Sequence, residues 1–236
     1  MKQNSPVVIG IVGGIGPEST ADYYKSIING YRALSQDGSY PRIIINSIDM
    51  SEMLALIDRK DYSGVTDLLL RSVTSLKNAG ANVAAIASNT PHVVFDKVKV
   101  LSPIPLISIV EASCRYATSL GLKKALLIGT RFTMQHNFYQ TAFIQKGISV
   151  IVPSAENQEI IHNIIFPELE EGIVIPEKKA EMMDICNDII VQESCDGIIL
   201  GCTELPLMLH EDDFSIAVLN TAQIHVQAIV ERLTGM

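Results

Sequence analysis

Residues 197–207 read GIILGCTELPL, and residues 84–94 read AAIASNTPHVV. Each stretch is a short apolar run that ends abruptly in small polar residues, which is typical of a buried strand followed by a turn. Ser88 and Cys202 each come just after the apolar run, and they are 114 residues apart. The two stretches therefore indicate a strand–turn unit that occurs twice in the chain.

A second pair of segments supports this repeat. Residues 7–14 read VVIGIVGG, and a similar strand and turn recur at residues 124–131 as KALLIGTR. The two glycine turns are 116 residues apart, within two residues of the first offset. Two features at nearly the same offset predict that one strand–helix–strand plan is used twice.

The apolar runs predict strands at residues 6–12, 42–48, 82–87, 124–128, 148–152, 197–200 and 215–219. These runs are almost continuous in hydrophobicity, as in parallel sheets that are covered on both faces. Helical patterns lie between them, at residues 17–34, 62–78, 109–119, 156–170, 177–193 and 221–233. The alternation predicts an α/β fold of two pseudo-symmetric Rossmann-like lobes, each a parallel sheet flanked by helices, with an active-site cleft between them.

The repeat also predicts the lobe boundaries. We expect lobe 1 to comprise residues 1–112 plus 213–236, because the last strand and helix should return to it, and lobe 2 to comprise residues 113–212. Ligands of open parallel sheets bind beyond the carboxyl ends of the strands. If the two lobes face each other, Ser88 and Cys202 approach a ligand from opposite sides.

Composition excludes several classes of partner. The 236 residues carry a formal net charge of -8, which argues against nucleic acid as a partner. The four cysteines form no CxxC pair, so neither a zinc site nor a disulfide framework is expected. The N-terminal segment does not resemble a signal peptide, and no apolar run reaches the ~18 residues of a membrane span. These features predict a cytoplasmic protein without a membrane partner.

Cys202 is the candidate for reactive chemistry. It follows a buried strand and Gly201, and Thr203 and Glu204 after it can start a helix. Because a helix N-terminus favours thiolate, this position predicts a lowered pKa for the Cys202 thiol. The alternative is a small buried core residue. The other three cysteines, Cys114, Cys186 and Cys195, are interpreted as core or near-surface thiols.

The residues after Ser88 offer polar groups at the end of the other strand. Asn89 and Thr90 could hold a carboxylate, although the same residue types also cap turns before helices. His92 could act as a general acid, but a solvated loop histidine is the favoured interpretation.

The glycine-rich segment at residues 10–17 must be weighed as a nucleotide site. No Gly-Lys-Ser/Thr follows it, so it is not a P-loop, and its glycine spacing does not fit a dinucleotide fingerprint. A tight turn whose amides meet a small carboxylate fits better. No cofactor and no metal are therefore expected.

Four ordered motifs resemble the aspartate/glutamate racemase superfamily, in its aspartate-racemase and broad amino-acid-racemase branch. They are IGIVGGIGPESTADYY at residues 9–24, SNTPH at 88–92, LLIGTRFTM at 126–134 and LGCTELPLML at 200–209. The resemblance implies two α/β lobes with a cleft between them, usually in a homodimer. It also implies inversion of an amino acid's α-carbon without pyridoxal phosphate or metal, by two cysteines on opposite sides of the substrate.

The resemblance assigns roles to individual positions. Cys202 matches the second catalytic cysteine. Positions that hold the α-carboxylate and ammonium region of the substrate are matched by Asn89, Thr90, Thr130 and Thr203. The turn Gly14, Ile15, Gly16 matches the loop near the far end of the substrate.

Two departures bear on the activity. Ser88 replaces the first catalytic cysteine, and a hydroxyl is a much weaker acid than a thiol. The cations that grip a side-chain carboxylate in dicarboxylate-specific members fall near Met53 and Glu170 here. The sequence favours an amino-acid racemase that uses Cys202 and Ser88. The alternatives are a single-cysteine lyase or isomerase, like a decarboxylase or a maleate isomerase, and a non-catalytic protein that binds a small acid.

Overall fold

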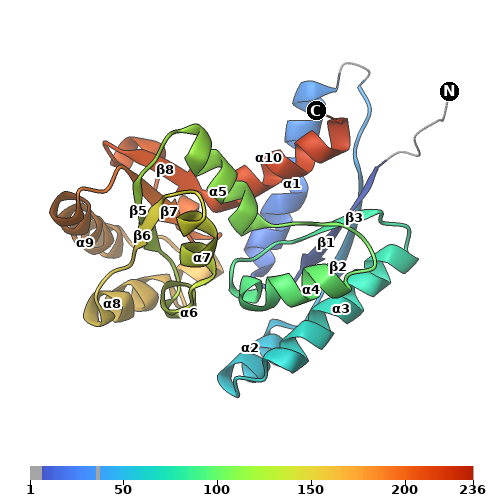
Figure 1. Ribbon diagram of the computed structural model, residues 1–236, viewed down its shortest axis with the longest axis horizontal. Coiled ribbons are helices and arrows are strands. Elements are labelled where there is room, and N and C mark those ends of the chain that lie inside the picture. Colours follow the sequence, from blue (N-terminus) through green and yellow to red (C-terminus); the bar gives the residue numbers. More distant parts are fainter. Residues whose placement is uncertain (1–6, 36–37, 236) are drawn as a thin grey trace. The chain divides into compact units, whose positions relative to one another are not determined.

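The computed structural model describes residues 7–35 and 38–235 (Figure 1). The chain divides into two compact units, Met1–Ile109 with His225–Met236, and Val110–Ile224. Each unit contains one four-stranded parallel sheet with helices around it, so the predicted α/β class is confirmed. Pro6, the expected start of the first strand, lies outside the described residues.

The two sheets have the same strand order. The first sheet is β2-β1-β3-β4 and the second is β6-β5-β7-β8. The strands are β1 Val8–Gly13, β2 Arg42–Ser47, β3 Val83–Ile86, β4 Leu106–Ile107, β5 Lys124–Ile128, β6 Ser149–Ile151, β7 Gly197–Leu200 and β8 Ala217–Asn220. The predicted bounds of β5 and β7 are confirmed, whereas the two-residue β4 is too short to appear as an apolar run.

The strand register confirms the repeat. Val12 pairs with Ile86 in the first sheet, and Ile128 pairs with Leu200 in the second. The first members of these pairs are 116 residues apart and the second members 114, which are the two offsets found in the sequence. The same strand–helix–strand plan is therefore used twice, and Ser88 and Cys202 follow equivalent strands.

The placement of the last strand differs from the prediction. β8 pairs with β7, with Val218 opposite Ile198, so the expectation that residues 215–219 return to the first lobe is wrong. The edge of the first sheet next to β3 is already taken by β4. Only the helical segment from His225 onward belongs to the first unit.

The helices are α1 Pro17–Leu34, α2 Met50–Asp58, α3 Tyr62–Asn78, α4 Phe95–Leu101, α5 Ile109–Ser119, α6 Arg131–Gln135, α7 Phe138–Ile144, α8 Ala155–Ile165, α9 Pro176–Glu193 and α10 Thr221–Thr234. The predicted bounds of α1, α3 and α5 are confirmed. The predicted helix at residues 156–170 ends at Ile165, and a short 3₁₀ turn, Leu169–Glu171, follows. No helix in the described ranges combines the length and apolar character that a membrane span requires.

The first unit is held together by close packing and a buried polar chain. A Cβ at Gly10 would lie 3.0 Å from Leu76 Cδ1, so glycine lets α3 lie close against β1. The Tyr23 hydroxyl and His225 Nδ1 are 2.9 Å apart, and His225 Nε2 is 3.0 Å from the Ile107 carbonyl oxygen. This chain ties α1 and α10, which run side by side in Figure 1, to β4.

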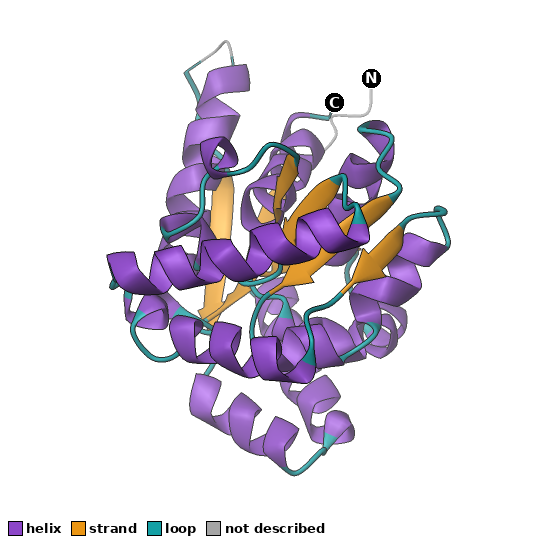
Figure 2. Ribbon diagram, turned by 90° about the vertical axis from the view of Figure 1, so that its left-hand side faces the viewer, coloured by secondary structure: helices purple, strands orange, loops and turns teal. Residues whose placement is uncertain are grey.

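The second unit buries a large apolar cluster between its sheet and helices α8 and α9. The cluster includes Leu126, Ile128, Ile161, Ile165, Met182, Ile198 and Leu200. Helix α7 contributes two further fully buried rings, Tyr139 and Phe143. Figure 2 shows the strands, in orange, lying among these helices. This packing holds the carboxyl ends of β5 and β7, where the candidate residues lie.

Gly14, in the turn after β1, can be compared with Gly121 to measure how much that turn depends on the absence of a side chain. Gly14 and Gly121 both have φ near the left-handed region, at +81° and +74°. A Cβ at Gly14 would overlap the Ile48 carbonyl oxygen, whereas nothing lies within 4 Å of one at Gly121. We predict that Gly121→Ala lowers the free energy of unfolding by about 1 kcal/mol. Gly14→Ala should cost about 1–3 kcal/mol more, because the backbone at Ile48 must move. Urea unfolding of both variants measures this difference, and equal losses would contradict it.

Candidate active site

The site in the second unit lies where β5 and β7 end. The Gly201 N–H donates to the Ile128 carbonyl at 2.7 Å. A Cβ at Gly129 would lie 2.9 Å from the Gly201 carbonyl oxygen, so the two strand ends lie against each other without side chains between them. The next residues, Thr130 and Cys202, therefore leave the sheet from adjacent strands.

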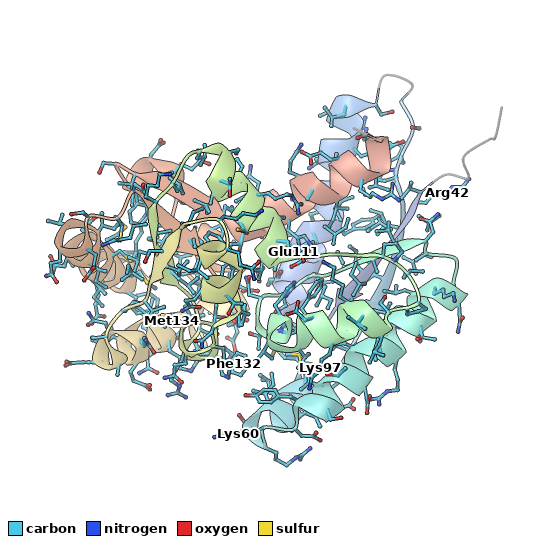
Figure 3. All side chains as sticks on the ribbon, in the orientation of Figure 1. Arg42, Lys60, Lys97, Glu111, Phe132 and Met134 are labelled. Carbon is cyan, nitrogen blue, oxygen red and sulfur yellow. The ribbon has the colours of Figure 1, made fainter. Side chains whose placement is uncertain are left out.

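Cys202 is buried next to two carboxyl groups. The residue is 6% exposed. Cys202 Sγ lies 3.0 Å from Glu204 Oε2 and 3.8 Å from Glu170 Oε1. Met134 of α6, labelled in Figure 3, is part of the same buried cluster. Cys202 thus shares the burial of a core residue, but its sulfur has polar partners that a packing role does not require.

The protonation of Cys202 differs from the prediction. Burial, and then the charges of Glu204 and Glu170, raise the pKa of the Cys202 thiol well above its ordinary value. The predicted lowering is wrong because no α-helix starts here: Cys202 is followed by a turn and a three-residue 3₁₀ helix, Leu205–Leu207. In the free protein Cys202 is a protonated thiol that donates to Glu204.

The pKa values of the two carboxyl groups are also raised. Burial and the charge of Glu204 raise the pKa of Glu170 to about 7, and burial raises the pKa of Glu204. Thr203 Oγ1 donates to Glu204 Oε2 at 2.8 Å. Glu204 Oε1 is buried and has no hydrogen-bond partner. The three groups therefore form an acidic trio, Glu170, Cys202 and Glu204, that can exchange protons among its members.

The equivalent strand end in the first unit carries neutral groups. Ser88 and Asn89 are buried, at 7% and 3% exposure, and Thr90 begins a 3₁₀ helix, Thr90–Val94. The turn after β1 lies at the same edge, and the Gly14 N–H donates to Thr20 Oγ1 at 3.0 Å. Ile15 and Gly16 lead from this turn into α1.

His92 is not the solvated loop residue that was expected. It is 4% exposed and its ring stacks on Phe95, with the centroids 4.6 Å apart. His92 Nδ1 lies 3.0 Å from the Ser88 carbonyl oxygen, to which it donates, and Nε2 is buried without a partner. Burial and the neighbouring His225 lower the pKa of His92 to about 3. His92 is therefore neutral at physiological pH and cannot be the general acid.

The structure places the remaining predicted residues in both units. Gly14, Ile15, Gly16, Ser88, Asn89 and Thr90 lie in the first unit, and Thr130, Cys202 and Thr203 lie in the second. Thr130 caps α6, with its Oγ1 3.4 Å from the Thr133 N–H nitrogen. The approach of Ser88 and Cys202 to opposite faces of one ligand stays a prediction.

The match to known proteins spans almost the whole chain. The sequence profile of the Asp/Glu/hydantoin racemases matches residues 12–229. The chain belongs to this family. Its fold is similar to that of an Asp/Glu racemase-like protein from Yersinia pestis, at a TM-score of 0.89 and 32% identity over 97% of this chain and 99% of that one.

Two other family members are similar to this one. An aspartate racemase homologue from Pyrococcus horikoshii OT3 has 36% identity and a TM-score of 0.84, over 96% of this chain and 99% of that one. The broad-specificity amino-acid racemase RacX of Bacillus subtilis is 28% identical over 148 residues. That alignment covers 61% of this chain and 63% of RacX.

The sequence alone did not reveal the acidic trio of this family member. Glu204 could have been suspected, because it comes two residues after Cys202. Glu170 lies 32 residues before Cys202, in the 3₁₀ turn after α8, and only the fold brings its carboxyl group to the sulfur. The sequence indicated only that Glu170 stands where a cation was expected.

The raised pKa of Glu170 predicts a pH-dependent cost to stability. Its pKa of about 7 in the folded protein lies above the ~4.3 of a free glutamate. The folded state therefore binds more protons between these values, and stability falls as the pH rises through this range. We predict that Glu170→Gln stabilises the protein by about 2 kcal/mol more at pH 8 than at pH 4.5.

Urea unfolding at the two pH values measures this difference. Glu171→Gln is the matched control, because Glu171 is the exposed neighbour in the same turn. We expect the control to change stability equally at both pH values. If Glu170→Gln also changed stability equally at both pH values, burial would not raise the pKa of the Glu170 carboxyl group.

Proposed function

We propose that this protein is a cofactor-independent amino-acid racemase in which Cys202 moves a proton to or from Cα and Ser88 serves the opposite face. The observation that carries the proposal is the Cys202 thiol held 3.0 Å from the Glu204 carboxylate at the carboxyl end of β7. Family membership and the similarity to RacX and to an aspartate racemase homologue support it.

The thiol and the carboxylate divide the work at one face. Because its pKa is raised, Cys202 is protonated in the free protein and has a proton to deliver to a planar α-carbanion, which leaves a thiolate. In the opposite direction Glu204 accepts the thiol proton first, and the thiolate then removes the α-proton. Each direction moves one proton between sulfur and carbon, and Glu204 exchanges one proton with solvent, so that both the thiol and the carboxylate are restored.

The other face has a weaker acid. Ser88 would act directly or through a water molecule, and its hydroxyl has no carboxylate counterpart to Glu204 because Thr90 occupies the equivalent position. General acid–base catalysis depends on a pKa matched to the task, so the two directions should have unequal kcat values. Their KM values should differ by the same factor, because the equilibrium constant of a racemization is one.

The substrate is proposed to be an amino acid about the size of aspartate or glutamate, without a strict requirement for a side-chain carboxylate. Met53 is buried and apolar, and Glu170 is acidic and 3.8 Å from the reactive sulfur. Neither can pair with a second carboxylate. A panel of amino acids is therefore needed to identify the substrate.

A second candidate function is a one-base lyase or isomerase acting on a malonate-like or maleate-like acid. It is favoured by one observation, the presence of a single cysteine at the two equivalent strand ends. Such an enzyme needs one proton donor and would not exchange the α-proton of an amino acid.

Exchange of the α-proton in heavy water tests the racemase proposal. We predict exchange on at least one amino acid of the panel, and a loss of at least about 100-fold in Cys202→Ala. Cys186→Ala is the control, because Cys186 is a fully buried thiol whose pKa is raised by burial alone. Its exchange rate should be unchanged. Failure of the native protein to exchange any α-proton would refute the proposal.

A thiol at position 88 should balance the two directions. We predict that Ser88→Cys raises the rate on the poorer enantiomer by about tenfold or more, because a thiol is the better acid. Polarimetry or chiral chromatography from each pure enantiomer measures the two rates. Ser75→Cys adds a thiol on the exposed side of α3 and should change neither. No gain in Ser88→Cys would favour the one-base function.

A further inference from the structure

The acidic trio has the composition of a metal-binding site. One ligand atom from each of Glu170, Cys202 and Glu204 lies within 4.8 Å of the others. A thiolate with two carboxylates is a donor set that a borderline-soft divalent cation such as Zn²⁺ accepts. Hard cations such as Mg²⁺ prefer oxygen alone, so the sulfur favours zinc over magnesium.

The distances suit a tetrahedral ion. Bonds of ~2.3 Å to sulfur and ~2.0 Å to oxygen place the two ligand atoms about 3.5 Å apart in a tetrahedral site. The observed separations from Cys202 Sγ, 3.0 Å to Glu204 and 3.8 Å to Glu170, lie on either side of this value. Small side-chain movements would therefore bring all three atoms into contact with one ion.

The burial and charge of the trio also point to a cation. Glu204 is 3% exposed, and its Oε1 has no hydrogen-bond partner. A buried carboxylate oxygen without a hydrogen-bond partner is costly, and a cation bound to that carboxylate offsets the cost.

We propose that Glu170, Cys202 and Glu204 bind one Zn²⁺ ion or a similar thiophilic divalent cation, and that the bound ion blocks Cys202. The hydrated ion loses water as it takes up the three ligands, and the Cys202 proton passes to solvent as the sulfur–metal bond forms. Glu170 is partly exposed and provides the side from which the ion enters. The predicted inhibition rests on the proposed function, whereas the binding does not.

Cobalt tests the site directly, because a thiolate bound to Co²⁺ gives a charge-transfer absorption band. We predict that the native protein binds one Co²⁺ with this band and that added Zn²⁺ removes the band by displacement. Cys202→Ala should abolish the band. Glu204→Gln should weaken binding by at least about tenfold, because it removes a charged ligand of the ion.

Two matched variants control for the other thiols and carboxylates. Cys186→Ala and Glu171→Gln should both keep the band and the affinity, since neither residue belongs to the trio. Circular dichroism of each variant establishes that it is folded. A band that persists in Cys202→Ala, or a native protein that binds no Co²⁺, would overturn the proposal.

Measuring α-proton exchange on the same samples separates the two proposals. We expect Zn²⁺ to inhibit exchange and a chelator to restore it. Metal binding through Cys202 without any exchange would leave the metal site standing and remove the racemase function. Exchange that Zn²⁺ does not alter, in a protein without the cobalt band, would remove the metal site and leave the racemase function standing.

Discussion

The proposed chemistry of this protein depends on one buried contact, the hydrogen bond between the Cys202 thiol and the Glu204 carboxylate. The chain must leave β7 through Gly201, where the Ile128 carbonyl and the neighbouring strand end leave no room for a side chain. The following turn and short 3₁₀ helix then fold Glu204 back to the sulfur. Without that tight exit the carboxylate would point elsewhere, and the thiol would be an ordinary buried cysteine.

The duplicated fold makes the difference between the two strand ends informative. Both units use the same strand order, and residues 88 and 202 follow equivalent strands. One end carries a thiol with a carboxylate two residues later, and the other carries a hydroxyl with Thr90 at that place. The buried histidine near Ser88 is neutral. One unit of the duplicated fold thus has an acidic strand end that can exchange protons, and the other unit has a neutral strand end.

The sequence was a good guide wherever a signal is local. Long amphipathic helices such as α1 and α3, and continuous apolar strands such as β5 and β7, could be bounded from pattern alone. Helices α2, α4, α6 and α7 are five to nine residues long and give too few turns for a clear period. The sheet that β8 joins, the burial of His92 and the position of Glu170 depend on contacts between distant segments. The pKa of Cys202 was predicted in the wrong direction because no α-helix starts there and because burial, which depends on distant segments, raises it.

A raised thiol pKa suits proton transfer at carbon better than a lowered one would. The α-proton of an amino acid is a very weak acid, and the strength of a base rises with the pKa of its conjugate acid. A thiolate formed in this buried acidic surrounding is scarce but strong, whereas a helix N-terminus would make it abundant and weak. In the proposed mechanism Glu204 makes the scarce form accessible by taking the thiol proton over 3.0 Å. In the proposed mechanism the negative charge of the two carboxyl groups strengthens the thiolate, and the proposed affinity for a thiophilic metal has the same physical cause, because that charge also attracts cations.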